Sequence, residues 1–301
     1  MKNIHVGFLL SYDYEKLKTA IPLVYDYSDR IFIAYDSNNL TWSGNKFAVD
    51  DSFFVWLKEI DKDNKIEFYR DNFYIPTLTA IQNDTRERYM LSLKMGIGNW
   101  LIQIDSDEYV LNFKGFVKSL RKYDKYLDNP KANPIQIGAF HVDVYKYLED
   151  GILYVKDTCK VLLATNYPNY KLARQTREQV IYVNTYVLHE SLARTEEELT
   201  VKFNNWGHTH ELNSDFLDKW RKATSKNFNE IKNVFYLTGK QWSRLGFVEG
   251  KSIDDFQKKI DKLDIVNINK FFILKKNFGQ WFKFKFFEPK NRKNEFEDYF
   301  Y

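Results

Sequence analysis

Four consecutive polar residues, Asp105-Ser106-Asp107-Glu108, offer the clearest chemistry in the chain, and they follow the apolar residues of segment 100–104. A short apolar run bounded by glycine and charged residues predicts a buried β-strand. Alternate side chains of an extended chain point the same way, so Asp105 and Asp107 would share one side. At the carboxyl end of a strand, where open α/β sheets bind ligands, this pair predicts a divalent cation site for Mg²⁺ or Mn²⁺.

The same residues also admit a purely structural interpretation. Asp-x-Asp occurs in turns, where an aspartate caps the following helix. Residues 113–127 have helical periodicity, and Asn112 or Asp107 could supply that cap. The triplet alone leaves the two interpretations balanced, and the buried strand before it favours the metal.

Composition limits the class of protein. The 301 residues suffice for one large domain, or one domain with an appendage. The single cysteine, Cys159, excludes an intramolecular disulfide, and no segment has the pattern of a signal peptide or of a membrane-spanning helix. We therefore expect a cytoplasmic protein. The net charge is only +4 and eight basic residues fall within 270–293, so a general nucleic-acid-binding surface is disfavoured.

The elements around the acidic motif predict an α/β sheet. Segments 4–10 and 31–35 have the pattern of buried strands with a helix between them, which fits a right-handed parallel βαβ unit. Asp36 then lies at a strand end, either as an acceptor for a nucleobase or ribose group or as a turn former. A helix over 77–95 carries Arg86, which could reach a diphosphate, although such an arginine is more often solvated.

The second half of the chain has a different pattern. Longer strands are expected over 135–145, 152–164 and 180–188 without comparable helices between them, which indicates a mixed sheet with an antiparallel part. His189 ends the last of these strands, and His208 and His210 lie in a later loop. Histidine is a common metal ligand, so at least one of the three is predicted to bind the metal.

The C-terminal region interleaves lysine with aromatic residues. Phe271, Leu274 and Phe278 have helical spacing, continued by Trp281 or Phe282, whereas 282–286 alternates like a strand. The segment either lies on an anionic membrane surface or packs its aromatics on the main domain with its lysines in water. We favour the second interpretation, and keep peripheral membrane contact through 270–293 as the alternative.

Taken together, these residues resemble GT-A glycosyltransferases, in particular bacterial family-2-like enzymes, over roughly residues 1–215. The motifs that carry the resemblance are the apolar strand with Asp-x-Asp-Glu over 100–109, then Val187-Leu188-His189-Glu190, Ala193-Arg194-Thr195 and Asn205-Trp206-Gly207-His208. The resemblance implies a GT-A α/β fold with a mixed central sheet over 1–215. A mainly helical region with a basic aromatic tail would follow over 216–301.

The resemblance also implies a function: transfer of a sugar from a UDP- or GDP-sugar to a hydroxyl of a glycan or lipid-linked acceptor, with Mn²⁺ or Mg²⁺. Bacterial surface glycan synthesis, at the inner face of the cytoplasmic membrane, is the expected setting. By position Asp36 would contact the nucleoside, and Asp105 with Ser106 the donor. The metal would be held by Asp105 and Asp107, with His208 or else His189 completing its coordination.

The catalytic base stays open. Inverting relatives often carry Glu-Asp or Asp-Asp in mid-chain, and the one similar pair here, Glu149-Asp150, precedes a glycine as a turn would. The other candidates are Glu190, Asp143 and Asp157. We expect an inverting enzyme in which Asp107→Ala abolishes transfer without unfolding the protein.

Two other classes of function fit parts of the sequence. Haloacid-dehalogenase-type phosphatases also place Asp-x-Asp after an apolar strand and would use Asp105 as the nucleophile. That family prefers Thr or Val where this chain has Tyr109, and has its motif near the start of the chain. A non-catalytic protein that binds a membrane or a glycan through the C-terminal segment is the other alternative.

Overall fold

The N-terminal part of the chain builds the parallel half of a central sheet. The computed structural model describes residues 2–205, 213–237, 242–263 and 268–287. Within them, four strands pair in parallel in the order β3-β2-β1-β4, so their carboxyl ends meet at one edge. Strands β1 and β4 are buried along their whole length and mostly apolar, because both of their faces are covered. The strands are β1 (Ile4–Leu9), β2 (Arg30–Asp36), β3 (Ile66–Asp71) and β4 (Trp100–Ile104).

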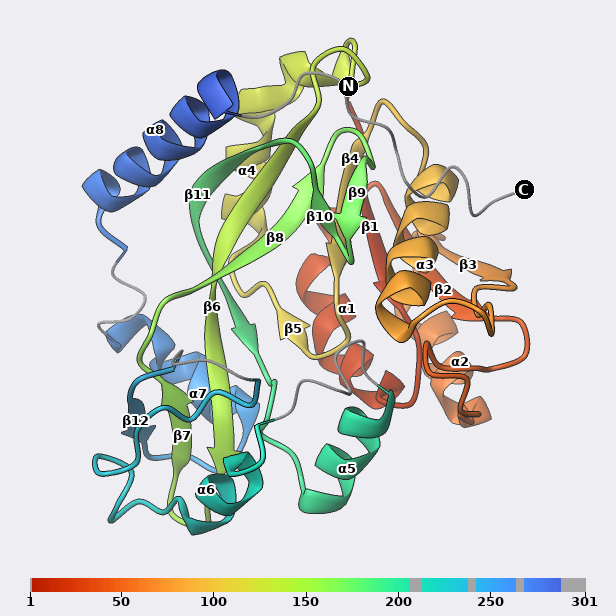
Figure 1. Cartoon of the computed structure of the whole chain (residues 1–301). Coiled ribbons are helices and arrows are strands. Elements are labelled where there is room, and N and C mark those ends of the chain that lie inside the picture. Colours follow the sequence, from red (N-terminus) through yellow and green to blue (C-terminus); the bar gives the residue numbers. More distant parts are fainter. Residues whose placement is uncertain (1, 206–212, 238–241, 264–267, 288–301) are drawn as a thin grey trace.

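Helices cover both faces of this half, as Figure 1 shows. Side chains alternate along β1, so Val6 and Phe8 pack in the cluster that includes helix α1, whereas Leu9 packs with helix α3. Gly7 lets α3 approach closely, because a Cβ there would lie 2.8 Å from Leu91 Cδ2. A Thr79–Gln82 capping box begins α3. These helices are α1 (Leu17–Tyr25), which follows the 3₁₀ turn η1 (Tyr14–Lys16), α2 (Asp51–Ile60) and α3 (Ala80–Met95).

The second half of the sheet is mixed, as predicted. Strand β8 pairs antiparallel with β4 and joins the halves, so the path of the sheet is β12-β7-β6-β8-β4-β1-β2-β3. Strand β11 lies parallel to β6 and antiparallel to β5. The strands are β5 (Glu108–Tyr109), β6 (Ile135–Tyr147), β7 (Ile152–Val155), β8 (Cys159–Thr165), β11 (Gln179–His189) and β12 (Leu245–Val248), with a separate hairpin of β9 (Tyr170–Leu172) and β10 (Gln175–Thr176).

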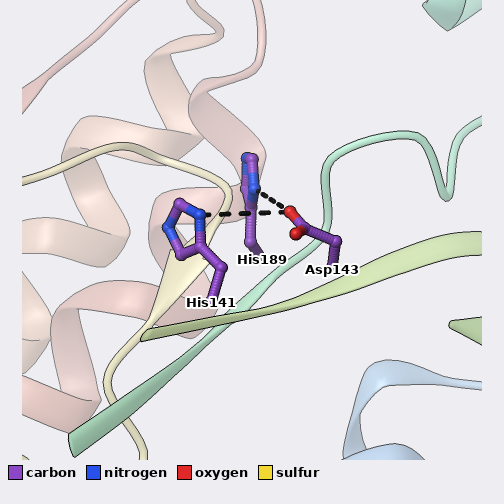
Figure 2. Close-up of side chains that lie close together, drawn as sticks. All are labelled: His141, Asp143 and His189. Atoms are coloured by element: carbon purple, nitrogen blue, oxygen red, sulfur yellow. Dashed lines mark hydrogen bonds and ion pairs between the residues drawn. The ribbon is translucent and has the colours of Figure 1, made fainter. Parts of the chain in front are cut away.

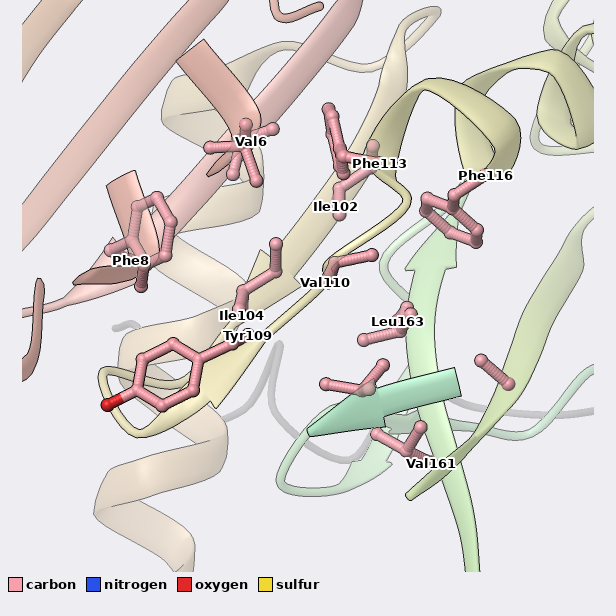
Figure 3. Packing of buried hydrophobic residues seen from close by; sticks show 14 of the residues in the cluster. Val6, Phe8, Ile102, Ile104, Tyr109, Val110, Phe113, Phe116, Val161 and Leu163 are labelled. Atoms are coloured by element: carbon pink, nitrogen blue, oxygen red, sulfur yellow. The ribbon is translucent and has the colours of Figure 1, made fainter. Parts of the chain in front are cut away.

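A continuous apolar core supports the acidic motif. Figure 3 shows Ile102 and Ile104 of β4 in one cluster with Phe113 and Phe116 of helix α4 and with Leu163 of β8. The amphipathic α4 begins at the cap Asn112, whose side chain accepts the Gly115 N–H. The remaining helices are α4 (Phe113–Leu120), η2 (Arg121–Leu127), α5 (Glu196–Asn205), α6 (Phe216–Lys222), α7 (Ile253–Lys259), η3 (Ile260–Lys262) and α8 (Lys270–Phe287).

Several predicted boundaries were wrong. The strand expected over 152–164 is two strands, because Asp157 between them accepts hydrogen bonds from the Ser243 hydroxyl and the Arg244 N–H and shapes a turn. The C-terminal region is not only helical, since β12 pairs with β7 and extends the sheet. The predicted division into domains over 1–215 and 216–301 stays a prediction. Residues 282–286 are helical rather than extended, within α8. No helix of the described residues is long and apolar enough to span a membrane.

Candidate active site

Strand register brings the candidate residues together. In the antiparallel pair of β5 and β11, Glu108 lies opposite His189. In the parallel pair of β11 and β6, His189 lies beside Asp143, and Val187 beside His141. Figure 2 shows the resulting group, in which His189 Nδ1 lies 2.7 Å and His141 Nδ1 4.0 Å from Asp143 Oδ1. Three strands that are distant in sequence therefore meet at the end of β4.

Asp107 is the most strongly paired carboxylate of the site. Its Oδ2 accepts hydrogen bonds from Arg194 Nη2 at 2.6 Å and Lys202 Nζ at 2.9 Å, and its Oδ1 lies 3.6 Å from His189 Nε2. Burial raises the pKa of Asp107, but Lys202, His189 and Arg194 outweigh it and hold the pKa well below its usual range. Arg194 also pairs with Asp13 at 3.1 Å. Asp107 is therefore ionised, and cations surround it.

Asp105 is the more exposed member of the pair. Its side chain is 34% exposed, and its Oδ1 accepts a hydrogen bond from Arg88 Nη2 at 2.8 Å. Arg88 is itself buried and pairs with Asp84 at 2.5 Å. Arg174 lies 3.9 Å from the second Asp105 oxygen. Asp105 thus projects from the strand end with two arginines behind it.

Glu108, the last residue of the motif, has a different position. Its buried carboxylate makes a two-point ion pair with Arg174, with Nη1 2.7 Å from Oε2 and Nη2 bonded to Oε1. His141 Nε2 lies 2.9 Å from the same Oε1. Glu108 therefore joins β5 to the β9–β10 hairpin and to β6, and it fixes the framework behind the two aspartates.

A cavity of about 260 Å³ opens at the carboxyl ends of β1, β2 and β4, and both Asp105 and Asp107 line it. Two parts of its lining differ in chemistry. The charged wall consists of Arg88, Asp105, Asp107, Arg174, His189 and Lys202. The Trp42 wall consists of Leu40, Thr41, Trp42, Ile81 and Glu87.

The Trp42 wall contains a buried neutral acid. Trp42 Nε1 donates to Glu87 Oε2 at 2.6 Å. Burial raises the pKa of Glu87 to about 8, although the Trp42 N–H and Arg88 oppose the rise. Glu87 is therefore largely protonated at neutral pH. The Thr41 hydroxyl donates to Asn205 Oδ1 at 2.8 Å and ties this wall to α5.

The residues predicted to contact the donor occupy different positions. Ser106 is buried and lines the cavity. Asp36 also lines it, but both of its oxygens accept backbone N–H groups, those of residues 38 and 40 on one oxygen and of residues 73 and 74 on the other. Arg86 Nη1 donates at 2.7 Å to the carbonyls of Asn72 and Phe73, and Arg86 does not line the cavity. The arginine of α3 that does is Arg88.

Of the three base candidates beyond the 149–150 pair, Glu190 opens into a cavity. It lines a second cavity of about 540 Å³, which shares Tyr12 and Asp13 with the first. Its oxygens accept hydrogen bonds from Lys16 Nζ at 2.6 Å, Tyr109 OH at 2.7 Å and Tyr147 OH at 2.7 Å.

The carboxylates of the other two base candidates are bound by neighbouring side chains. Asp143 is 1% exposed and binds His189. Asp157 binds Ser243 and lines neither cavity. Asp143 is therefore closed to a substrate, and Asp157 lies away from both cavities.

Asp107 Oδ1 and His189 Nε2 are the atoms that could hold a divalent metal ion, next to the Arg194 and Lys202 cations on the other Asp107 oxygen. The bond from Asp143 to His189 Nδ1 directs Nε2 towards Asp107 Oδ1. Two ligand atoms about 2.1 Å from an ion lie roughly 3.0–3.4 Å apart, so the observed 3.6 Å needs only a small adjustment. Ligating atoms of His141, Asp143 and His189 also lie within 4.8 Å of one another. A mixed nitrogen and oxygen set suits Mn²⁺ better than Mg²⁺.

The predicted ligand His208 lies outside the described residues, as does His210. The structure adds cavity residues that the sequence interpretation had not selected, chiefly Arg174, Lys202 and Glu87. Lys202 did leave a signal, because it stands on α5 between the buried Leu199 and Phe203. A lysine among apolar neighbours on a helix face needs a buried acid as its partner.

Comparison with known proteins gives little further information. No protein-family model and no curated protein sequence matches the chain. Among solved structures, the chain is similar to the crystal structure of S. aureus TarS 1–349, a glycosyltransferase, with 14% identity and a TM-score of 0.29. The match covers 47% of this chain and 36% of that one, about a third of its length. At this TM-score the likeness carries no argument about fold or activity.

Proposed function

We propose that this protein is a GT-A glycosyltransferase, which moves a sugar from a nucleotide-diphosphate donor to an acceptor hydroxyl. The observation that carries the proposal is the pair Asp105 and Asp107, which lines one cavity at the carboxyl ends of parallel strands together with cationic side chains. Ligands of open α/β sheets bind at this edge. The resemblance of the sequence motifs to GT-A enzymes agrees with this placement.

The two walls of the cavity suit the two parts of such a donor. On the charged wall, Lys202 and the arginines 88 and 174 can bind the oxygens of a diphosphate through charge-assisted hydrogen bonds. On the Trp42 wall, the indole offers a surface on which a nucleobase can stack. A protonated Glu87 adds a hydrogen-bonding group there without repelling the phosphates. The donor would therefore lie with its diphosphate towards Asp105 and Asp107.

A divalent ion would be held by Asp107 and His189, with Asp143 orienting the imidazole. The chemistry that it supplies when bound is neutralisation of charge on the departing nucleoside diphosphate. Arg194 and Lys202 fix the second oxygen of Asp107, so the first oxygen is the one that faces His189. Asp105, held by Arg88, remains directed at the donor.

The second cavity supplies a place for the acceptor, and Glu190 is the base that this arrangement favours. Its carboxylate would take the proton of the acceptor hydroxyl as that oxygen bonds to the anomeric carbon and the bond to the diphosphate breaks. Such a transition state has oxocarbenium character. Lys16 and the hydroxyls of Tyr109 and Tyr147 hold the carboxylate in place. A single direct displacement inverts the anomeric centre.

The two sites are close in the fold. The Glu190 N–H donates to the Asp107 carbonyl at 2.9 Å. Glu190, the proposed base, therefore lies directly beside Asp107 and His189, the proposed metal ligands. Tyr12 and Asp13 line both cavities and mark where donor and acceptor would meet. A glycan or lipid-linked acceptor, from bacterial surface glycan synthesis, and a UDP- or GDP-sugar donor are the substrates that we propose.

The test is release of nucleoside diphosphate from a panel of UDP- and GDP-sugars with Mn²⁺ present. Wild type is expected to hydrolyse at least one donor slowly, and Asp105→Asn to lose this activity. Asp63→Asn, an exposed aspartate paired only with Lys65, is the matched control and should keep it. No release from any donor, or full activity in Asp105→Asn, would contradict the proposal. Release of phosphate from a phosphomonoester by wild type would favour the phosphatase alternative.

A further inference from the structure

Helix α8 exposes an apolar stripe that the proposed site does not use. Five large residues are spaced by three or four positions, which places them on one side of a helix. The exposed fractions reach 71% at Phe271, 66% at Leu274 and 61% at Phe278. The stripe consists of Phe271, Leu274, Phe278, Phe282 and Phe286, with Trp281 and Phe287 beside it. The 18-residue helix that carries the stripe is about 27 Å long.

The opposite side of α8 is fixed to the sheet. The Asn277 side chain accepts the Tyr182 N–H at 2.7 Å and donates to the Tyr182 carbonyl at 2.9 Å, so it pairs with β11 much as a strand would. Phe272 lies against Phe140 with ring centroids 6.0 Å apart. Figure 1 shows α8 on the outside of the molecule beside β11. These contacts set the rotation of the helix and leave its stripe facing outward.

The charge of α8 is of one sign. The helix carries five lysines, at 270, 275, 276, 283 and 285, and no acidic residue. Lysine ammonium groups lie beside its aromatic rings, Lys285 Nζ 4.9 Å from the Trp281 centroid and Lys276 Nζ 5.2 Å from that of Phe272. By helical spacing Lys275 and Lys285 lie among the stripe residues, so the exposed face combines aromatic and aliphatic side chains with positive charge.

We propose that α8 docks on an anionic lipid surface. Its stripe would enter the boundary between head groups and acyl chains, and its lysines would lie at the lipid phosphates. Phe, Trp and Lys in alternation suit this boundary, because the rings leave water while the ammonium groups remain at the head groups. No spanning segment is required.

The positive charge of α8 favours an anionic lipid surface over a second copy of the chain as the partner of the stripe. In a symmetric dimer through the stripe, Lys275 and Lys285 of one helix would lie against the same lysines of its partner, and like charges across an interface disfavour association. An anionic bilayer is complementary to the same face. The contact would also place the catalytic domain at a surface, independently of which sugar it transfers.

Cosedimentation with vesicles tests the apolar part. The full-length protein is mixed with vesicles of phosphatidylcholine, with or without phosphatidylglycerol. We expect wild type to bind the anionic vesicles, and Leu274→Gln/Phe278→Gln/Phe282→Gln to lose about tenfold or more in partitioning. The matched control is Val55→Gln/Leu93→Gln/Ile97→Gln, which changes three exposed apolar residues elsewhere and should bind as wild type does.

Charge variants test the electrostatic part. Lys275→Gln/Lys283→Gln/Lys285→Gln should weaken binding to anionic vesicles by about tenfold or more, since each lysine near such a surface contributes to attraction. Lys58→Gln/Lys118→Gln/Lys122→Gln, three lysines on α2, on α4 and just after α4, is the control. Added salt should weaken wild-type binding in the same direction.

Three results would overturn the proposal: no binding of wild type to anionic vesicles, equal binding by the Leu274/Phe278/Phe282 variant, or equal binding to neutral vesicles. A wild-type dimer that this variant converts to a monomer, with vesicle binding unchanged, would show a self-interface instead. Donor hydrolysis in the absence of lipid should be the same in wild type and variant. This separates failure of the docking surface from failure of the active site.

Discussion

The charged wall and the Trp42 wall each hold a deeply buried carboxyl group. The one on the charged wall is ionised, and the one on the Trp42 wall is neutral. Asp107 has a pKa well below its usual range, whereas the pKa of Glu87 rises to about 8. Burial acts in the same direction on both. The difference lies in their direct partners: Asp107 binds Arg194 and Lys202, while Glu87 binds the indole N–H of Trp42. A buried carboxyl therefore takes its charge from its neighbours.

This contrast gives the cavity two chemical ends. Asp107 is ionised and cations are abundant around it, which suits a diphosphate and a metal ion. Around Trp42 the wall is aromatic and apolar, with the Arg88 guanidinium 5.8 Å from the centre of the indole ring, which suits a nucleoside next to a diphosphate. Sequence patterns show acidic residues in both places, and only the partners found by folding distinguish them.

The largest effect is expected when the ionised carboxylate is removed. Asp107→Ala leaves Lys202 buried without its acid and Arg194 with Asp13 alone, which should lower the free energy of unfolding by about 3–5 kcal/mol and abolish transfer. This changes the expectation from sequence that the variant stays folded. Urea unfolding checks it, with the more exposed Asp105→Ala as the control. An unchanged urea midpoint for Asp107→Ala would show that the burial of these cations does not need Asp107.

Glu190 is a third carboxylate to compare with Asp107 and Glu87, because its direct partners are one lysine and two tyrosines. Glu190→Gln keeps the shape but cannot take a proton, so we expect kcat for transfer to fall by about 10²–10⁴-fold. Donor affinity should be unchanged, since Glu190 lines the second cavity rather than the first. Tyr147→Phe, which removes one supporting hydrogen bond, should reduce kcat much less. Loss of donor binding in Glu190→Gln would argue against separate donor and acceptor cavities.

Lys202 tests the cationic side of the charged wall. Lys202→Gln should weaken binding of a nucleoside diphosphate by about tenfold to hundredfold, because a buried charge-assisted contact is lost. Arg194 still pairs with Asp107 in this variant, so the carboxylate keeps a partner. Calorimetry compares it with Lys94→Gln, which changes a lysine on the outer part of α3. Equal affinities would place the diphosphate elsewhere.

Glu87 should show its effect in the pH dependence of stability. The folded pKa of about 8 exceeds the usual value of 4.5, so between these values the folded protein binds a proton that the unfolded chain has released. Stability from this group is complete below about pH 4.5 and is lost as pH rises towards about 8, by at most about 1.4 kcal/mol per pH unit.

Glu87→Gln removes this proton while its amide oxygen can still accept the Trp42 N–H. Denaturant unfolding at about pH 5 and about pH 8 should therefore show a smaller fall in stability for the variant than for wild type. An equal fall in stability between these pH values for wild type and variant would mean that Glu87 is ionised in the folded protein. The two walls would then not differ in the charge of their buried carboxyl groups.

Local pattern was enough to predict part of the fold and site. The apolar run before Asp105, the βαβ start and the change to longer strands are all properties of short segments, and each corresponds to elements of the structure. The ionic partners are not local. Arg174 and His141 bind Glu108, and Lys202 binds Asp107, although all three are distant from the motif in sequence. The pairing of β11 with both β5 and β6 brings His141 and His189 to the motif.

Asp36 and Arg86 illustrate the other limit of the sequence. Both residue types suggest contact with a donor, yet each is engaged by backbone groups that no residue pattern reveals. Their roles towards a donor stay predictions. Backbone hydrogen bonds of this kind depend on loop conformation after β2 and β3, which composition does not determine.

The most direct test of the central claim is a thermal-shift panel of nucleoside diphosphates, measured with and without Mn²⁺. We predict that UDP or GDP raises the Tm of wild type, that Mn²⁺ increases the shift, and that Asp105→Asn reduces it. If no nucleoside diphosphate changes the Tm with or without the metal, the cavity at Asp105 and Asp107 does not bind a nucleotide-sugar donor.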